Sequence, residues 1–290
     1  MPEDAVLLTS PNVLQACLEL DFLFHEIFTD IKVTLDVHEA LSARCVVYLE
    51  YDFNLALVQS IKSEQKRLVL MHLGDETAIK DLTAYNLADV VLRNYYHEHI
   101  FRNPAWASKI HWMPNGYRNG LGQGAREPKP ASERKQLARF IGWLANPKSV
   151  DNDREVFALA AKRCEPMLHC VATQGFAGGF SPHLYRHLME ESIFAPCPAG
   201  NAPETIRLFD VLECGCIPIT RPLEFLKNSE AMGHGPFAFL DDWGELVDSL
   251  SAYHAISEHE SEFHKTQTAV NRFWQATKLI HAELAHRSVL

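Results

Sequence analysis

Short apolar runs rich in β-branched residues alternate along this chain with segments whose apolar residues have helical spacing. In the first part of the chain this pattern predicts strands over residues 5–9, 32–37, 45–51, 67–73 and 89–96 and a helical stretch over residues 11–28. Such alternation favours a parallel sheet whose crossover helices cover both faces. With 290 residues and 47% hydrophobic side chains, the chain can form one large or two smaller cores. We therefore predict an α/β protein.

A change in composition separates two parts of the chain. The segment from Arg118 to Arg139 is rich in glycine, proline and basic residues and lacks apolar periodicity, which is typical of a linker. The alternation of strand and helix then begins again and ends in about forty residues of helical pattern. The expected domains are residues 1–125 and 126–275, with residues 276–290 as a helix that packs back on the first domain.

The C-terminal helical pattern predicts one buried face. The apolar and small residues expected on that face are Phe263, Val270, Phe273, Thr277 and Leu284.

The overall charge bears on the partners of the protein. A formal net charge of -10 argues against nucleic acid, because a nucleic-acid-binding surface needs a basic face. The first twenty residues lack the pattern of a secretion signal, and no run of eighteen apolar residues occurs. We expect a cytoplasmic protein, with the basic linker as the local candidate for peripheral contact at the inner face of a membrane. The sequence does not indicate an oligomeric state.

The stretch ETIRLFDVLECGCIPIT combines a helix with the turn into a buried strand. Asn201, Glu204 and Thr205 lie at the start of this helix, where free amides and the helix dipole favour an anion. Arg207 in the first turn adds a forked cation suited to a diphosphate, and Asp210 could accept hydrogen bonds from ribose hydroxyls. The alternative is a surface ion pair between Arg207 and Asp210. Spacing alone does not decide between these interpretations.

This segment resembles the donor-binding segment of the exostosin-like glycosyltransferases, family 47 and its relatives. The residues that carry the resemblance are Ser192, Phe194, Pro198, Gly200, Arg207, Leu208, Phe209, Asp210, Gly215, Ile217, Pro218 and Ile219. One departure is Asp210, which stands where the family usually has a glutamate. Upstream, HLGDE, VVLRNYY and MPNGY are similar in order to the transferase domain of ribitol xylosyltransferase-like proteins.

The resemblance implies a GT-B architecture, with two Rossmann-like domains facing a central cleft. The N-terminal domain would be the acceptor side and the second domain would bind a nucleotide sugar, with UDP as the nucleotide. The implied enzyme is an inverting, metal-independent hexosyl- or pentosyltransferase of polysaccharide biosynthesis, without a cofactor. Its acceptor would be a hydroxyl of a glycan or a polyol phosphate.

An inverting transferase needs a base to take the proton of the acceptor hydroxyl. Asp75 follows an apolar run and is the first candidate for this base, with Glu76 and His72 after it. The alternative is that the two acids simply begin a helix, where they favour its dipole.

Further residues at predicted strand ends are candidates for the cleft. Arg93, Asn94, Asn115 and Tyr117 could contact the acceptor, although the loop at Asn115 could also be an ordinary chain reversal.

On the donor side, Gly142 follows a strand and Arg154 begins a helix, from which it could meet the diphosphate beside Arg207. A solvated helix charge is the alternative for Arg154. The sequence Asp151–Asn152–Asp153 spells the metal-binding motif of GT-A transferases, but its position before a helix favours N-capping, so we predict no metal site.

Two other functions stay open from the sequence. One is a catalytically silent scaffold that binds glycans or nucleotides, and the other is a metal-dependent GT-A transferase.

Overall fold

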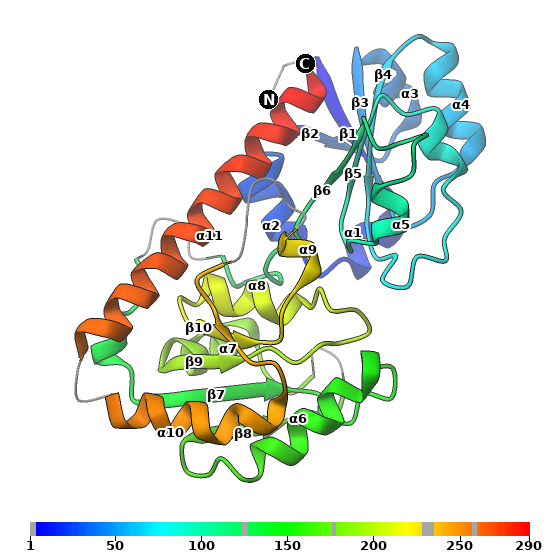
Figure 1. The fold of residues 1–290 in the computed structure, drawn as a ribbon. Coiled ribbons are helices and arrows are strands. Elements are labelled where there is room, and N and C mark those ends of the chain that lie inside the picture. Colours follow the sequence, from blue (N-terminus) through cyan, green and yellow to red (C-terminus); the bar gives the residue numbers. More distant parts are fainter. Residues whose placement is uncertain (1–3, 123–126, 176–177, 228–234, 257–259) are drawn as a thin grey trace. The chain divides into compact units, whose positions relative to one another are not determined.

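The computed structural model describes residues 4–122, 127–175, 178–227, 235–256 and 260–290. It divides into two compact units (Figure 1). Unit 1 comprises Met1–Asn115 and Lys278–Leu290, and unit 2 comprises Gly116–Thr277. The division therefore lies before the boundary expected after residue 125, because the residues that follow Gly116 pack within unit 2.

Unit 1 contains a six-stranded sheet in the order β2-β1-β3-β4-β5-β6, with every neighbouring pair parallel. The strands are β1 (Ala5–Leu8), β2 (Lys32–Thr34), β3 (Cys45–Glu50), β4 (Arg67–His72), β5 (Val90–Arg93) and β6 (Ile110–Trp112). All six residues of β3 are buried, as expected for a parallel strand covered on both faces. The strands expected from the apolar runs are confirmed.

The helices of unit 1 are shorter than the sequence pattern suggested. They are α1 (Pro11–Ala16), α2 (Leu20–Phe22), the π-helical η1 (Leu23–Ile27), α3 (Val37–Ser42), α4 (Leu55–Ser63), the 3-10 helix η2 (Thr83–Asn86) and α5 (Glu98–Phe101). The prediction of a single helical stretch over residues 11–28 is wrong. Ser10 caps α1, whose helix ends before Cys17, and a π-helical turn follows α2.

Unit 2 contains a five-stranded sheet in the order β11-β10-β9-β7-β8, again with parallel neighbours. The strands are β7 (Gln136–Gly142), β8 (Leu168–Ala172), β9 (Ser192–Pro196), β10 (Ile217–Thr220) and β11 (Ala238–Phe239). From β7 the chain goes first to β8 on one side and then to β9 on the other. The strand order thus reverses between β7 and β9, and ligands of open α/β sheets bind at the carboxyl ends of strands beside such a switch.

The connections of unit 2 are mostly helical. They are the 3-10 helices η3 (Ala131–Glu133), η4 (Val150–Asn152) and η5 (Trp243–Glu245), and the α-helices α6 (Asp153–Ala161), α7 (Pro182–Glu190), α8 (Ile206–Glu213), α9 (Glu224–Lys227), α10 (Leu246–Ile256) and α11 (Glu260–Val289). The division between the units falls within α11.

The buried face of α11 differs in detail from the expected one. Phe263, Val270 and Thr277 are buried as predicted, whereas Phe273 and Leu284 are half-buried. Trp274 is buried instead, and its indole donates to Glu213 at 2.6 Å. The large apolar surface of Trp274 therefore sets the face that α11 turns inward in unit 2.

The Asp151–Asn152–Asp153 segment does not provide the side-chain cap of α6 that the sequence predicts. Asn152 is the N-cap of α6 but makes no side-chain capping bond, and Ser149 Oγ instead accepts from the amide of Arg154 at 3.2 Å. The buried Asp153 carboxylate accepts from the indole of Trp243 at 2.8 Å and from the amide of Ala199 at 2.7 Å. Asp153 therefore ties α6 to the loop after β9. No cluster of three potential metal ligands occurs among the described residues.

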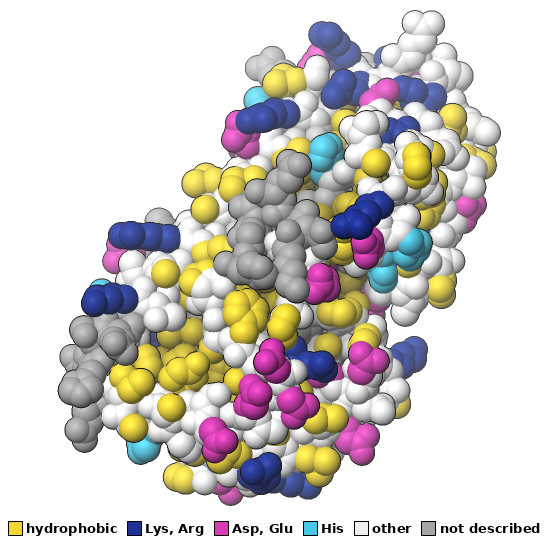
Figure 2. All heavy atoms as spheres, viewed as in Figure 1, with side chains coloured by type: hydrophobic (Ala, Val, Ile, Leu, Met, Phe, Trp, Pro, Cys, Tyr) yellow, Lys and Arg dark blue, Asp and Glu magenta, His cyan; other side chains and the backbone are white. Residues whose placement is uncertain are grey.

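The charges on the surface and the hydrophobicity of the helices concern the expected contacts with nucleic acid and membrane. Basic side chains on the face in Figure 2 are interspersed with acidic and apolar ones. Among the described residues, no helix has the length and apolar character needed to cross a bilayer.

Candidate active site

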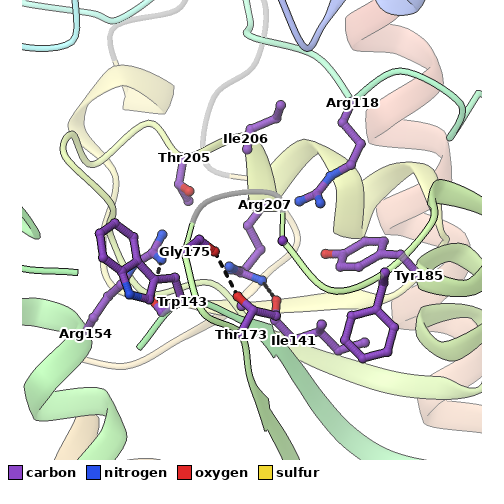
Figure 3. A pocket seen from close by; sticks show the side chains of 13 residues that line it. Arg118, Ile141, Trp143, Arg154, Thr173, Gly175, Tyr185, Thr205, Ile206 and Arg207 are labelled. Atoms are coloured by element: carbon purple, nitrogen blue, oxygen red, sulfur yellow. Dashed lines mark hydrogen bonds between the residues drawn. The ribbon is translucent and has the colours of Figure 1, made fainter. Parts of the chain in front are cut away.

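A hollow of unit 2 lies at the carboxyl end of β7, at the switch in strand order (Figure 3). Its walls come from the end of β7, the loop after β8, and the beginnings of α6, α7 and α8. The lining residues are Arg118, Ile141, Gly142, Trp143, Arg154, Thr173, Gly175, Gly178, Phe180, Tyr185, Thr205, Ile206 and Arg207. Four residues proposed from the sequence for the donor, Gly142, Arg154, Thr205 and Arg207, thus meet in one place.

Arg207 occupies the centre of this hollow. It is 6% exposed, its Nη1 donates to the carbonyl of Ile141, and its Cζ lies 4.3 Å from the ring centroid of Phe140. Its Nε is buried without a hydrogen-bond partner among the described groups. The guanidinium lies directly over Gly142, where a Cβ would come within 2.6 Å of Cζ. Glycine at residue 142 therefore makes room for the cation.

Arg154 lies on the side of Trp143, as Figure 3 shows. It is 4% exposed and donates to two backbone carbonyls, from Nη1 to Trp143 at 2.6 Å and from Nε to Ala199 at 3.1 Å. Burial in the first place, and repulsion by Arg207 in the second, lower the pKa of Arg154 to about 10. The interpretation of Arg154 as a solvated helix charge is therefore wrong, because its charge is buried beside a second cation.

The start of α8 completes this side of the hollow. Thr205 is the N-cap of α8 and makes no side-chain capping bond, so its hydroxyl does not occupy the first-turn amides. Glu204 is 3% exposed and is not one of the residues that line the hollow. Asn201 accepts from Asn146 Nδ2 at 3.0 Å, in the loop that precedes α8.

Asp210 has a specific partner that the sequence did not suggest. It is fully buried, its Oδ1 accepts from the amide of Arg118 at 2.9 Å, and its Oδ2 accepts from Arg118 Nε at 2.7 Å. Arg118 Nη2 lies 2.6 Å from the same Oδ2. A surface ion pair between Arg207 and Asp210 is therefore wrong, since the two side chains have different partners. A contact of Asp210 with ribose stays a prediction.

Tyr185 was also missed in the sequence. It projects from α7 and is 2% exposed, and its hydroxyl has no hydrogen-bond partner among the described residues. Its ring lies under the guanidinium of Arg118, with 4.4 Å from Cζ to the ring centroid. Burial first, and the nearby Asp210 carboxylate second, raise the pKa of Tyr185. No local motif identifies this residue, because helical spacing alone marks it as a core aromatic.

The candidate residues of unit 1 form a buried network at the carboxyl ends of β4 and β5. His72 Nε2 donates to the carbonyl of Tyr51 at 3.0 Å, so Nδ1 accepts from the hydroxyl of Tyr85 at 2.6 Å. Arg93, which is fully buried, donates to Tyr85 at 3.0 Å and to Asp75 Oδ2 at 2.8 Å. Burial first, and Arg93 second, lower the pKa of His72 to about 4.

This network determines how accessible the two candidate bases, Asp75 and Glu76, are. Asp75 is 2% exposed and is paired with Arg93, and its Oδ1 accepts from the amide of Ile79 at 3.0 Å. Burial alone would raise the pKa of Asp75, but the hydrogen bond and the charge of Arg93, together with the amide of Ile79, outweigh it and hold this pKa below its usual value. Glu76 is half-buried and accepts from the hydroxyl of Tyr95 at 3.2 Å. Of the two acids, Glu76 is the more accessible to an acceptor hydroxyl.

The remaining candidates for the acceptor are buried as well. Asn94 Nδ2 donates to Asn115 Oδ1 at 2.6 Å, and Asn94 Oδ1 accepts from the amide of Gly74 at 3.1 Å. These bonds fix the loop after β4. Tyr117 is 1% exposed and belongs to unit 2. Their contact with an acceptor stays a prediction.

Comparisons with known proteins give the fold. No protein-family model matches the sequence, and no curated protein matches it. The structure is similar to that of Anabaena HepE in complex with UDP, with a TM-score of 0.59, 12% identity and 98% of each chain covered. It is also similar to T4 phage BGT in complex with UDP and Mn2+, with a TM-score of 0.54, 10% identity, and 98% of this chain and 99% of that chain covered.

A third similarity is to sucrose-phosphate synthase from Thermosynechococcus elongatus, with a TM-score of 0.50, 13% identity, and 86% of this chain and 75% of that chain covered. The chain has the GT-B fold. Each unit contains one parallel sheet, and the similarity to HepE and BGT covers 98% of the chain. These two findings confirm the predicted fold class. The GT-A alternative is wrong, since the GT-B fold accounts for both halves.

Proposed function

We propose that this GT-B protein is a glycosyltransferase that binds a nucleotide sugar at the hollow of unit 2. One observation carries the proposal. Arg154 and Arg207 are 4% and 6% exposed and line the same hollow. Their hydrogen bonds go to backbone carbonyls, and neither has a carboxylate partner among the described residues. Burying two like charges without a counter-ion is costly, and a bound anion removes that cost.

A diphosphate fits this environment better than a single anionic group. Two guanidiniums with several N–H donors each match the oxygens of two linked phosphates, and the uncapped start of α8 adds amides and a positive dipole end. The structural neighbours support a nucleotide sugar, because HepE was crystallised with UDP-glucose and with UDP and glucose. We infer UDP as the nucleotide, and the exostosin-like segment at residues 192–219 agrees with it.

The proposed reaction is a transfer with inversion. The oxygen of the acceptor hydroxyl attacks the anomeric carbon, the bond from that carbon to the diphosphate breaks, and the hydroxyl proton passes to a base. Arg154 and Arg207 stabilise the negative charge that develops on the leaving diphosphate, which is the role a divalent ion has in metal-dependent transferases. We therefore propose that transfer does not require a metal.

Glu76 and Asp75 are the proposed sources of the base. Glu76 is the better candidate of the two, because the Asp75 carboxylate already has a buried cationic partner. The acceptor is a hydroxyl of a glycan or a polyol phosphate, as the resemblance implies. We expect the transferred sugar to be a hexose or a pentose. We expect the protein to act in the cytoplasm, or at the inner face of a membrane.

Thermal unfolding with added nucleotides tests the donor site. UDP should raise the melting temperature of the wild-type protein, and Arg207→Ala or Arg154→Ala should remove most of that shift. Losing one buried charge contact should cost roughly 2–5 kcal/mol of binding, or at least about thirtyfold in affinity. Arg163, exposed on the same unit, gives a matched control, Arg163→Ala. Unchanged stabilisation by UDP in Arg207→Ala would refute the donor site.

A silent scaffold is the second candidate. It would bind UDP but would not release UDP from a UDP-sugar in the presence of acceptors. A coupled assay of UDP release, run over a panel of UDP-sugars, separates a scaffold from an enzyme.

A further inference from the structure

Arg118 contributes a third guanidinium to the donor hollow, from outside the donor segment recognised in the sequence. It lines the hollow, and its side chain is 18% exposed. Its Nε and Nη2 are held by Asp210 Oδ2, and its backbone amide is held by Oδ1. These bonds fix the plane of the guanidinium and use only part of its five N–H donors. The side chain is therefore pre-organised, with donor capacity left for a ligand.

Tyr185 adds an independent observation on the same wall. Its hydroxyl is buried and unpartnered among the described groups, yet the residue lines the hollow. A buried hydroxyl without a partner costs stability, so its presence in a hollow points to a ligand that supplies the missing bond. Figure 3 shows Tyr185 below Arg118, on the side of Arg207 opposite Arg154 and Trp143.

We propose that Arg118 and Tyr185 form a second wall of the donor pocket, which binds the diphosphate opposite Arg154. This inference rests on the proposed function and adds two diphosphate contacts to it. The hydroxyl of Tyr185 donates to a phosphate oxygen, and the guanidinium of Arg118 donates to the same group. The hydroxyl of Tyr185 then gains the partner that it lacks in the free protein, and Arg118 uses N–H donors that Asp210 leaves over.

Asp210 is the positioning residue of this wall. Its three contacts with Arg118 hold the backbone and the guanidinium of one residue together. With both oxygens engaged and no exposed surface, Asp210 acts on the donor through Arg118. A direct contact of Asp210 with ribose predicts a different pattern of mutational effects.

Isothermal titration with UDP, GDP, uridine and inorganic pyrophosphate tests this wall. Tyr185→Phe is the sharpest variant, because it removes only the unpartnered hydroxyl. We expect it to raise the melting temperature of the free protein and to weaken UDP binding by about tenfold or more. A residue with a merely structural role would not gain stability while losing affinity. Uridine, which has no phosphate, should bind Tyr185→Phe and the wild type equally.

A double-mutant cycle tests the role of Asp210. Arg118→Gln leaves a buried carboxylate unpaired and can impair folding, so the neutral pair Arg118→Gln with Asp210→Asn is made alongside the single changes. If Asp210 acts through Arg118, the double variant binds UDP about as weakly as Arg118→Gln or Asp210→Asn alone. Additive losses, or a loss for uridine in Asp210→Asn, would instead assign Asp210 to ribose and overturn its positioning role.

The outcomes separate this inference from the proposed function. If the wild type binds none of UDP, GDP or pyrophosphate, both fail. A second outcome is that the wild type binds UDP and Arg207→Ala does not. If Tyr185→Phe and the neutral pair then bind UDP as tightly as the wild type does, only the second wall is refuted.

Discussion

Substituting a single glycine, Gly142→Ala, tests whether Arg207 acts from the place where the structure puts it. A Cβ at residue 142 would lie 2.6 Å from Cζ and 2.8 Å from Nη1 of Arg207. Carbon atoms in contact lie about 3.5–4.0 Å apart, so the guanidinium must withdraw by about 1 Å or more. The change leaves the charge of the protein and the identity of Arg207 untouched.

The expected loss follows from the contacts of Arg207. Moving the guanidinium breaks its bond to the Ile141 carbonyl and misaligns its donors toward the diphosphate. A hydrogen bond to a charged group contributes about 1.5–3 kcal/mol, so UDP affinity should fall by roughly 10- to 100-fold. Overpacking should also lower the stability of the fold, by about 1–3 kcal/mol.

Isothermal titration with UDP measures the effect, and two comparisons interpret it. Gly178 lines the same hollow, but a Cβ there would meet nothing closer than 3.7 Å, so Gly178→Ala should bind UDP within about threefold of the wild type. In an Arg207→Ala background, Gly142→Ala should have little further effect, because the two changes act on one contact. Wild-type affinity in a folded Gly142→Ala protein would refute the reasoning.

Three further predictions concern the network, the base and the metal. His72 is buried and neutral in the fold, with a pKa of about 4 against an ordinary value of 6.5, so the unfolded chain binds more protons between these values. Stability should therefore fall by roughly 3 kcal/mol as the pH drops from 7 to 4, and His72→Gln should flatten that part of the curve in urea unfolding. Glu76→Gln should lower turnover at least about 100-fold with little change in melting temperature. Asp75→Asn should instead lower the free energy of unfolding by about 3–5 kcal/mol, because it leaves Arg93 without its buried partner. The reverse pattern would make Asp75 the base. Transfer should survive EDTA, and its loss with recovery on adding Mg2+ or Mn2+ would contradict the metal-independent mechanism.

The strands of both sheets were predictable because their signal is local. Runs such as residues 46–49 and 68–71 are apolar over their full length, which is the pattern of a strand buried on both faces. The break in the helix expected over residues 11–28 was not predictable in this way. No glycine or proline marks a break at Cys17 or Glu19, and the apolar periodicity continues past these two residues. Tertiary packing, not helix propensity, decides where α1 ends.

The sequence predicts only that part of the proposed donor site which is contiguous along the chain. A strand, a turn and the start of α8 follow each other within about thirty residues, so the position of Arg207 could be read from the order of elements. The partners of that segment could not, because they come from distant parts of the chain. Arg118 and Asp210 are 92 residues apart, and Ile141 and Arg207 are 66 apart. Spacing rules for helices and turns contain no information about such pairs.

The charge balance of the hollow explains why Asp210 is needed there although it does not line it. Arg118, Arg154 and Arg207 contribute three guanidiniums, and Asp210 is the one carboxylate that pairs with any of them among the described residues, which leaves two positive charges uncompensated. Two excess charges suit a diphosphate, whereas three would raise the cost of the empty pocket further. Arg207 and Asp210, one turn apart on α8, thus serve one site in different ways: Arg207 supplies a charge toward β7, and Asp210 offsets and aligns the charge of Arg118.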